Sequence, residues 1–410
     1  MELAMDRNER HYILMLSLIY LMPIMRIVFD LLIGNYTVVT IAIYPIALII
    51  LFFINGGMKP RIRKWTLLFI VYITIVSVFH VIAGSSSFIQ AISSVMRFMV
   101  LALSVNYVTF AKPSYKGSKR IARLTFVFFG FTIVASIIQM IPAMPLHNML
   151  LSAGGNMVSS TALLNVRANG AVGGTVIAYG VYIVICSFFL VLGVEAFNSF
   201  ERVALFVGII AAMFMNYSRA CFVGVAGAFA GYFFLFKFRE LRVPYKLLSI
   251  CMIFAFCWWY LSTDNIMVRY IFQGDIYRSV SDGKRIESSI AGLGQMDTFA
   301  KQLFGISAGQ NTGFSAGGKI LGDGAIVSIL LDYGGIGLLL FLSFLIETLV
   351  SINRGVANVG KKALITIVYL DLIIILLINS GFLENINIML FSYPLYLFVY
   401  CLPSYKPEEI

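Results

Sequence analysis

Charged residues are scarce in this chain of 410 residues: Asp, Glu, Lys and Arg make up 12% of it, whereas 60% of its residues are hydrophobic. Soluble globular domains carry about 25% charged residues, and a core of this size could not hide so much apolar surface. The composition therefore excludes an ordinary water-soluble protein and predicts a chain that lies largely within a lipid bilayer.

Cysteine and histidine are also rare, with five and three copies in the whole chain. The cysteines all fall within or at the ends of apolar runs and form no Cys-x-x-Cys pair, so we expect neither a disulfide framework nor a structural metal site. The histidines are scattered at His11, His80 and His147. The sequence therefore predicts no metal and no cofactor.

Long apolar runs fill most of the remaining sequence. A hydrocarbon core about 30 Å thick requires roughly 20 apolar residues per helix. Runs close to that length cover residues 12–34, 36–55, 65–83, 89–111, 124–142, 171–194, 203–217, 220–236, 247–262, 325–349, 363–380 and 388–403. We therefore expect an all-α polytopic membrane protein with about 12 transmembrane helices, forming a single multi-pass domain over residues 1–410.

The positive charges orient these spans. Most of the 30 Lys and Arg residues lie in the N-terminus, the C-terminus and the even-numbered connections, as in the stretches 59–64 and 112–123. Cytoplasmic loops of membrane proteins carry such an excess, so both termini are expected in the cytoplasm. The net charge of +11 then reflects topology, and nucleic acid is not an expected partner.

Two connections on the opposite side are unusually long, at residues 143–170 and 263–322. Loops of this length in a compact domain usually carry a function. Within the longer loop, an amphipathic run from Gly283 to about Leu303 predicts a helix. The glycine-rich stretch after it predicts an irregular segment.

Ionisable residues inside the predicted spans cost about 2.5–3.5 kcal/mol each on insertion scales, so they need a partner or a wet cavity. Arg26 and Asp30 lie four residues apart and can neutralise each other on one helix face. Arg97 and Asp371 have no such neighbour in the sequence. Each of them is therefore expected either to pair with another helix or to line a cavity.

Several arginines lie on the external side, against the general charge bias. Arg167 precedes the sixth span, Arg219 lies in the short connection between the seventh and eighth, and the long loop holds Arg278, Lys284 and Arg285. A guanidinium offers a fixed fork of donors to phosphate oxygens and stays charged in a low-dielectric site. Arginines that converge would suit a lipid-linked pyrophosphate, whereas arginines that stay apart would each bind an anionic headgroup.

Three motifs resemble those of the O-antigen polymerase and ligase family: the runs GKRIESSIAGLGQMDTFAKQLFGISAGQ and LGDGAIVSILLDYGGIGLLLFL, and the Ser218-Arg219-Ala220 step. The resemblance implies a membrane-embedded, GT-C-like glycosyltransferase with a large periplasmic loop, located in the bacterial inner membrane with its active site facing the periplasm. It also implies undecaprenyl-pyrophosphate-linked oligosaccharides as substrates, membrane lipids as surroundings and a chain-length regulator protein as a partner.

The same resemblance implies roles for individual residues. Arg219 matches the arginine of the Ser-Arg turn and Arg285 that of a Gly-x-Arg motif, both pyrophosphate ligands, while Arg167 is a looser match. Further candidates for contact with pyrophosphate or glycan are Arg278, Lys284 and Arg97. Asp323 stands where ligases commonly carry a histidine, which favours a polymerase and makes Asp323 the first candidate for the base of a metal-independent transfer.

Alternatives remain for both the base and the activity. Asp323 directly precedes an apolar helix and could be an N-cap, and Glu287 and Asp282 are rival bases. An O-antigen ligase acting on the lipid A core shares nearly every feature and differs in its acceptor. A lipid-linked oligosaccharide flippase would also fit twelve helices, but it needs no loop of this length and would show two similar halves.

Overall fold

The structure is a computed structural model, and it describes residues 46, 50, 62–110, 115–141, 146, 168, 170, 176–192, 197–216, 219–234, 243–244, 251, 258, 287, 289–310, 325–354, 362–363, 366 and 369–370. The predicted spans at 12–34 and 388–403 lie outside these residues, and those at 36–55, 247–262 and 363–380 are described only at scattered positions. Regular structure in the described ranges is helical, without strands.

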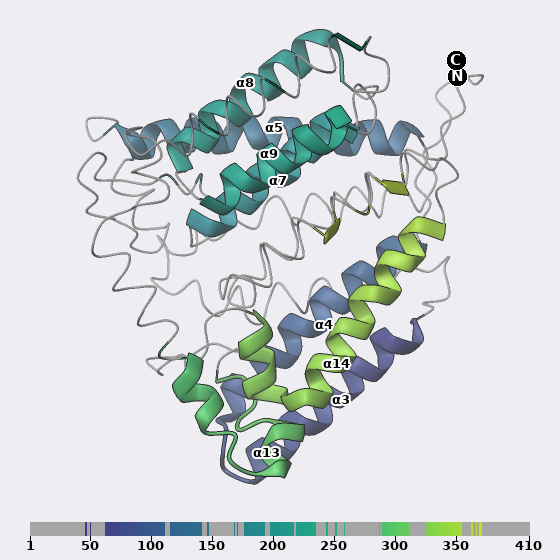
Figure 1. Cartoon of the computed structure of the whole chain (residues 1–410), viewed down its shortest axis with the longest axis vertical. Coiled ribbons are helices and arrows are strands. Elements are labelled where there is room, and N and C mark those ends of the chain that lie inside the picture. Colours follow the sequence, from purple (N-terminus) through teal and green to yellow (C-terminus); the bar gives the residue numbers. More distant parts are fainter. Residues whose placement is uncertain are drawn as a thin grey trace.

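Eight helices have defined bounds in the described ranges (Figure 1): α3 (Lys64–Ile82), α4 (Phe88–Phe110), α5 (Tyr115–Met140), α7 (Val176–Leu192), α8 (Ser199–Asn216), α9 (Arg219–Tyr232), α13 (Phe299–Phe304) and α14 (Ala325–Arg354). Four stretches are long and apolar enough to cross a membrane: Lys64–Ile82, Ala122–Met140, Ser199–Asn216 and Ile326–Ser351. The expected all-α membrane character is thus confirmed for the described residues, while the number of twelve spans stays a prediction.

Helix α8 begins four residues before its predicted span and α14 ends five residues after its own. Two further differences are larger. Helix α5 begins at Tyr115, before the expected start at residue 124, because the Lys- and Arg-rich stretch ahead of the apolar run is itself a good helix former. The amphipathic run of the long loop is not one helix through Leu303. A turn interrupts it, with Gln295 N donating to Gly292 O (3.0 Å) and Met296 N to Leu293 O (3.1 Å), before α13 begins.

Reciprocal side-chain caps fix the starts of helices α4 and α8. At α4, Ser87 N donates to Gln90 Oε1 and Gln90 N donates to Ser87 Oγ, both at 3.3 Å. At α8, Asn198 N donates to Glu201 Oε2 and Glu201 N donates to Asn198 Oδ1, both at 2.8 Å. Each arrangement is a capping box, which satisfies backbone N–H groups that the first helical turn leaves without partners.

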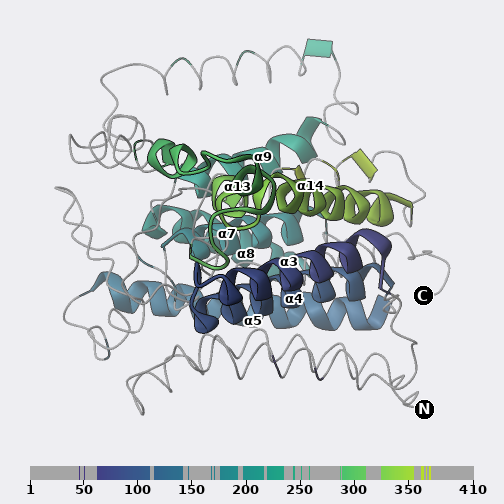
Figure 2. The ribbon, with the colours of Figure 1, turned by 90° about the horizontal axis from the view of Figure 1, so that it is seen from below.

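Helices α3, α4, α13 and α14 pack as one group (Figures 1 and 2). The interior of this group is aromatic: the Phe69 ring stacks on Phe344 at 5.9 Å and meets Phe98 edge-on at 5.3 Å. Phe341 lies 5.5 Å from Phe69. Because these rings come from α3, α4 and α14, they fix the three helices against one another.

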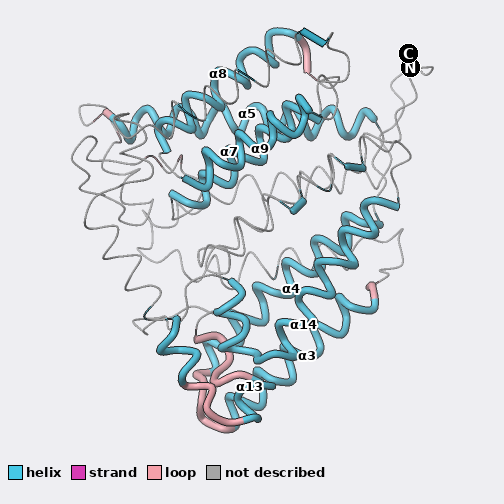
Figure 3. Tube along the Cα trace, viewed as in Figure 1, coloured by secondary structure: helices cyan, strands magenta, loops and turns pink. Residues whose placement is uncertain are grey.

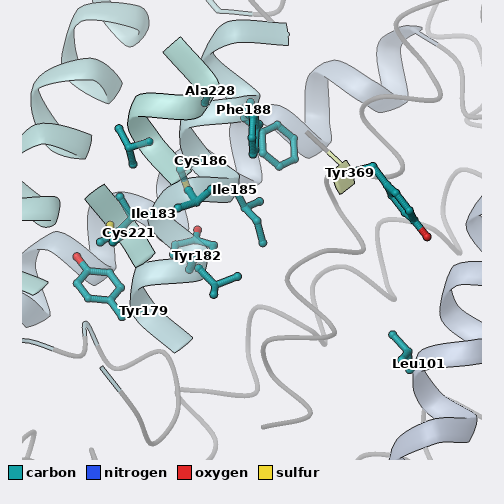
Figure 4. Close-up of a cluster of buried hydrophobic side chains, with 14 of the residues drawn as sticks. Leu101, Tyr179, Tyr182, Ile183, Ile185, Cys186, Phe188, Cys221, Ala228 and Tyr369 are labelled. Atoms are coloured by element: carbon teal, nitrogen blue, oxygen red, sulfur yellow. The ribbon is translucent and has the colours of Figure 1, made fainter. Parts of the chain in front are cut away.

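Helices α5, α7, α8 and α9 form the second group, with α7 at its centre. Residues 179–191 of α7 are all buried, as expected for a helix that is apolar on every side. Figure 4 shows Cys186 and Phe188 of α7 in one cluster with Cys221 and Ala228 of α9. The buried helix thereby gives α5, α8 and α9 a common core.

The helix ends that the charge pattern assigns to each side of the membrane can be located in Figure 3. The start of α3 and the start of α8, both assigned to the cytoplasmic side, lie on the right of the view. The end of α5, assigned to the external side, lies on the left. The α3–α4 turn and the loop after α13, assigned to the same side, lie at the bottom.

Candidate functional site

Three of the candidates named from the sequence lie in the described ranges: Arg97, Arg219 and the rival base Glu287, which is helical and exposed. Arg219 is the first residue of α9 rather than part of the turn before it, and only its backbone is described. Arg97 lies in α4 and is 6% exposed. The other candidates lie outside the described residues: Arg167, Arg278, Lys284, Arg285 and Asp323, as do the rival base Asp282 and the intramembrane residues Arg26, Asp30 and Asp371.

The backbone at the end of α8 is joined to the residue that follows Arg167. Ala168 N donates to Met215 O at 3.1 Å, and the Asn216 side-chain amide donates to Ala168 O at 3.3 Å. Both Ala168 and Asn216 are fully buried, so this exchange of hydrogen bonds is protected from water. The chain leading from Arg167 therefore meets the end of α8 three residues before Arg219.

A second contact fixes the same short segment two residues later. Gly170 N donates to Gln139 Oε1 of α5 at 3.2 Å. Gly170 has a φ of 60° and packs so closely on the Tyr179 ring that a Cβ would lie 2.5 Å from that ring. Tyr179 is itself held by Ser136 of α5, with 2.9 Å between the two hydroxyl oxygens. Helices α5, α7 and α8 thus all hold the end of the 143–170 loop.

The glycine-rich stretch after α13 is bound to the other helix group. We name residues 305–310 the clasp. Ile306 N donates to Leu331 O at 2.7 Å, Ala308 N to Ser86 Oγ at 2.6 Å, and Gly309 N to Asp332 Oδ2 at 3.0 Å. Asp332 has no exposed surface, so its carboxylate is directed to the clasp and not to solvent.

Helix α14 is broken where it meets α13. Gly334 has φ 68° and ψ −172°, a conformation that L-residues with a side chain avoid. A Cβ at Gly334 would also overlap the backbone of Leu303 and Phe304. At the break, Tyr333 O accepts a hydrogen bond from the Tyr72 hydroxyl at 2.8 Å. The motif Asp332-Tyr333-Gly334 therefore encodes a docking point for the end of α13.

Polar side chains continue from this break into the group of α3, α4 and α14. The Tyr333 hydroxyl lies 2.6 Å from Ser94 Oγ and 3.4 Å from Ser77 Oγ, and all three residues are buried. Arg97 follows Ser94 by three residues, so it lies on the same face of α4. Arg97 is about 13 Å along the axis from the first residue of α4, which places it inside the helix group rather than at its mouth.

The clasp and the anchoring of residue 168 were not predicted from the sequence. A signal for the clasp was present, because Asp332 is a charged residue inside an apolar span and lies two residues before Gly334 and Gly335. Among the described residues, no three His, Cys, Asp or Glu side chains are grouped as a metal site would require.

No family model matches the chain, and neither the curated proteins nor the solved structures contain a significant match to it.

Proposed function

We propose that the protein is a surface-polysaccharide polymerase of the O-antigen type. It transfers a growing glycan from undecaprenyl pyrophosphate onto an incoming undecaprenyl-pyrophosphate-linked repeat unit. A hydroxyl of the incoming repeat forms the new bond to the anomeric carbon, and the bond from that carbon to the pyrophosphate breaks. Undecaprenyl pyrophosphate leaves, and the hydroxyl proton passes to a base.

The observation that supports this proposal best is the junction of Ala168 with the end of α8. It joins the loop that carries Arg167 to the helix end that leads into Arg219, by hydrogen bonds of 3.1 and 3.3 Å. Two segments that are far apart in the sequence and carry arginines on the expected external side therefore meet in space. Converging guanidinium groups are suited to two adjacent phosphates.

In the proposed mechanism, Arg219 and Arg285 bind the leaving pyrophosphate, and Arg167 supports them. Each preorganised donor of this kind contributes about 3 kcal/mol to stabilising the charge that develops in the transition state. Asp323 accepts the proton from the acceptor hydroxyl. Arg278 and Lys284 are assigned to contacts with the glycan and the pyrophosphate, whereas Arg97, which is buried inside the group of α3, α4 and α14, is assigned no such contact.

Purified protein supplied with only the lipid-linked repeat unit tests the proposal. We expect a ladder of glycans from the wild type and none from Arg219→Ala or Arg285→Ala at equal amounts of membrane-inserted protein. Arg354→Ala is the matched control, because Arg354 is exposed at the C-terminal end of α14, whereas the proposed base Asp323 precedes the N-terminal end of that helix. A ladder from Arg219→Ala would contradict the proposal, and a product formed only with lipid A core present would indicate a ligase instead.

A further inference from the structure

Exposed apolar side chains gather on the part of the long loop that precedes the clasp. We name residues 289–304 the loop anchor; it comprises one short helical stretch, a turn and α13. Ile290 is 63% exposed, Phe299 75% and Phe304 43%. If water surrounded this segment, these side chains would stay hydrated at a considerable cost in free energy. Burying one such side chain contributes about 1.5–3 kcal/mol.

The loop anchor carries almost no charge. Its only ionisable side chains are Asp297 and Lys301, which form an ion pair of 2.7 Å across one helical turn. The hydrogen bond from Lys301 lowers the pKa of the Asp297 carboxyl. Thr298 caps α13 by accepting Lys301 N at 3.3 Å. Neutralised charges and a capped helix start are compatible with a position at the membrane interface.

The end of the loop anchor lies beside α3 and not above it. The Tyr72 hydroxyl is 3.2 Å from Leu303 O, and His80 Nε2 is 3.2 Å from Phe304 O. Tyr72 precedes the end of α3 by ten residues, which corresponds to about 15 Å along the helix axis. His80 precedes the end of α3 by only two residues. The end of the loop anchor therefore lies alongside the last turns of α3, next to the α3–α4 turn.

The apolar surface of α3 and α4 continues onto this segment. At the α3–α4 turn, Phe79 is 64% exposed, Ile82 81% and Phe88 66%. Helix α3 is long and apolar enough to cross a membrane, so its exposed apolar side chains face lipid. His80, the neighbour of Phe79, bonds directly to Phe304. The loop anchor is thus adjacent to the exposed apolar surface of a helix that is long and apolar enough to cross a membrane.

We propose that the loop anchor inserts into the bilayer leaflet next to the α3–α4 turn, with Ile290, Phe299 and Phe304 among the lipid acyl chains. The long loop is then a membrane-attached element whose position relative to the bundle is set by lipid on one side and by the clasp on the other. This inference does not depend on the proposed enzymatic activity.

Tryptophan fluorescence in vesicles tests the insertion. Trp65, Trp258 and Trp259 are replaced by Phe, and Phe299→Trp or Ile290→Trp is introduced singly. Each protein is reconstituted into phosphatidylcholine vesicles with or without bromine atoms on the acyl chains. A variant that retains only the native Trp65, exposed on membrane-spanning α3, serves as the positive control.

We expect both new tryptophans to lose more than half of their emission in brominated vesicles, as the Trp65 control does, and to resist acrylamide in the water. Quenching by acrylamide without quenching by bromine would show a water-exposed loop and overturn the proposal. Resistance to both quenchers would overturn it as well, because it would show that protein, either another part of this chain or a second copy, covers the segment.

Discussion

Removing the Asn216 side chain should release the segment that begins at Ala168. In the structure the Asn216 amide donates to Ala168 O at 3.3 Å, and neither residue is exposed. Asn216→Ala leaves a buried carbonyl without this donor, which costs about 1–3 kcal/mol. If the segment undocks on its own, the undocked population rises by about 5- to 150-fold.

Trypsin measures the undocked population directly, because it cleaves the peptide bond after an arginine. The bond between Arg167 and Ala168 contains the Ala168 nitrogen, which donates to Met215 O in the docked state. Cleavage of a transiently open segment follows the equilibrium population of the open form when closing is fast. We expect the Asn216→Ala protein in vesicles to be cut at this bond faster than wild type by the factor above, measured from the fragment that carries a C-terminal tag.

Ser187→Ala is the control for a general loss of stability. Ser187 is buried in α7 and donates to Val184 O at 2.6 Å within its own helix. Its removal also deletes a buried hydrogen bond, but it does not touch residue 168. Equal cleavage rates in wild type and Asn216→Ala, or an equal rise in Ser187→Ala, would refute the junction between this segment and α8.

Further predictions concern the clasp, the helix break and the base. Gly334→Ala should lower the thermal unfolding midpoint, because the added Cβ overlaps Leu303. Gly130→Ala is the control and should be neutral or stabilising, because a Cβ at Gly130 meets nothing within 4 Å. Equal midpoints for the two variants would contradict the break in α14. Asp332→Ala should destabilise the protein by about 1–3 kcal/mol, because the clasp loses its acceptor. Asp332→Asn should destabilise it by less, because an amide oxygen still accepts the Gly309 N–H. Denaturant titration in detergent distinguishes the two variants. For Asp323, activity that survives in Asp323→Asn would assign it to helix capping, whereas a base requires loss in both Asn and Ala variants.

The membrane helices of the described part were largely predictable. The spans expected at 65–83 and 89–111 match α3 and α4 to within one residue at each end, and the expected start of α14 at residue 325 is correct. These boundaries are clear because apolar runs end at charged or glycine-rich stretches, so length and composition alone define them. For α5 the charged residues are part of the helix, and composition then marks the membrane core and not the helix end.

The break in α14 could not be derived from its own sequence. Glycines in an apolar span are typical of close helix packing, and Gly337, against Tyr72 and Tyr333, has that role. Gly334 differs because its backbone conformation is set by α13, about thirty residues earlier in the chain. Such a contact depends on a tertiary arrangement that local patterns do not contain.

The chemistry of the site could be predicted from the sequence, but the contacts that hold its segments in place could not. External arginines could be recognised because they violate a strong charge bias. The groups that hold their segments are mostly backbone N–H and C=O groups, as in the bonds of Ala168 and the clasp. Backbone groups are the same at every residue, so a sequence does not show which of them meet.

The central claim is that Arg219 and Arg285 converge on one pyrophosphate, and cross-linking tests it most directly. The five native cysteines are replaced by alanine, and single cysteines are introduced by Arg219→Cys and Arg285→Cys, separately and together. A short bifunctional thiol reagent should join the two positions within one chain in the double variant. Absence of that cross-link, while each single cysteine reacts with a monofunctional reagent, would contradict the account.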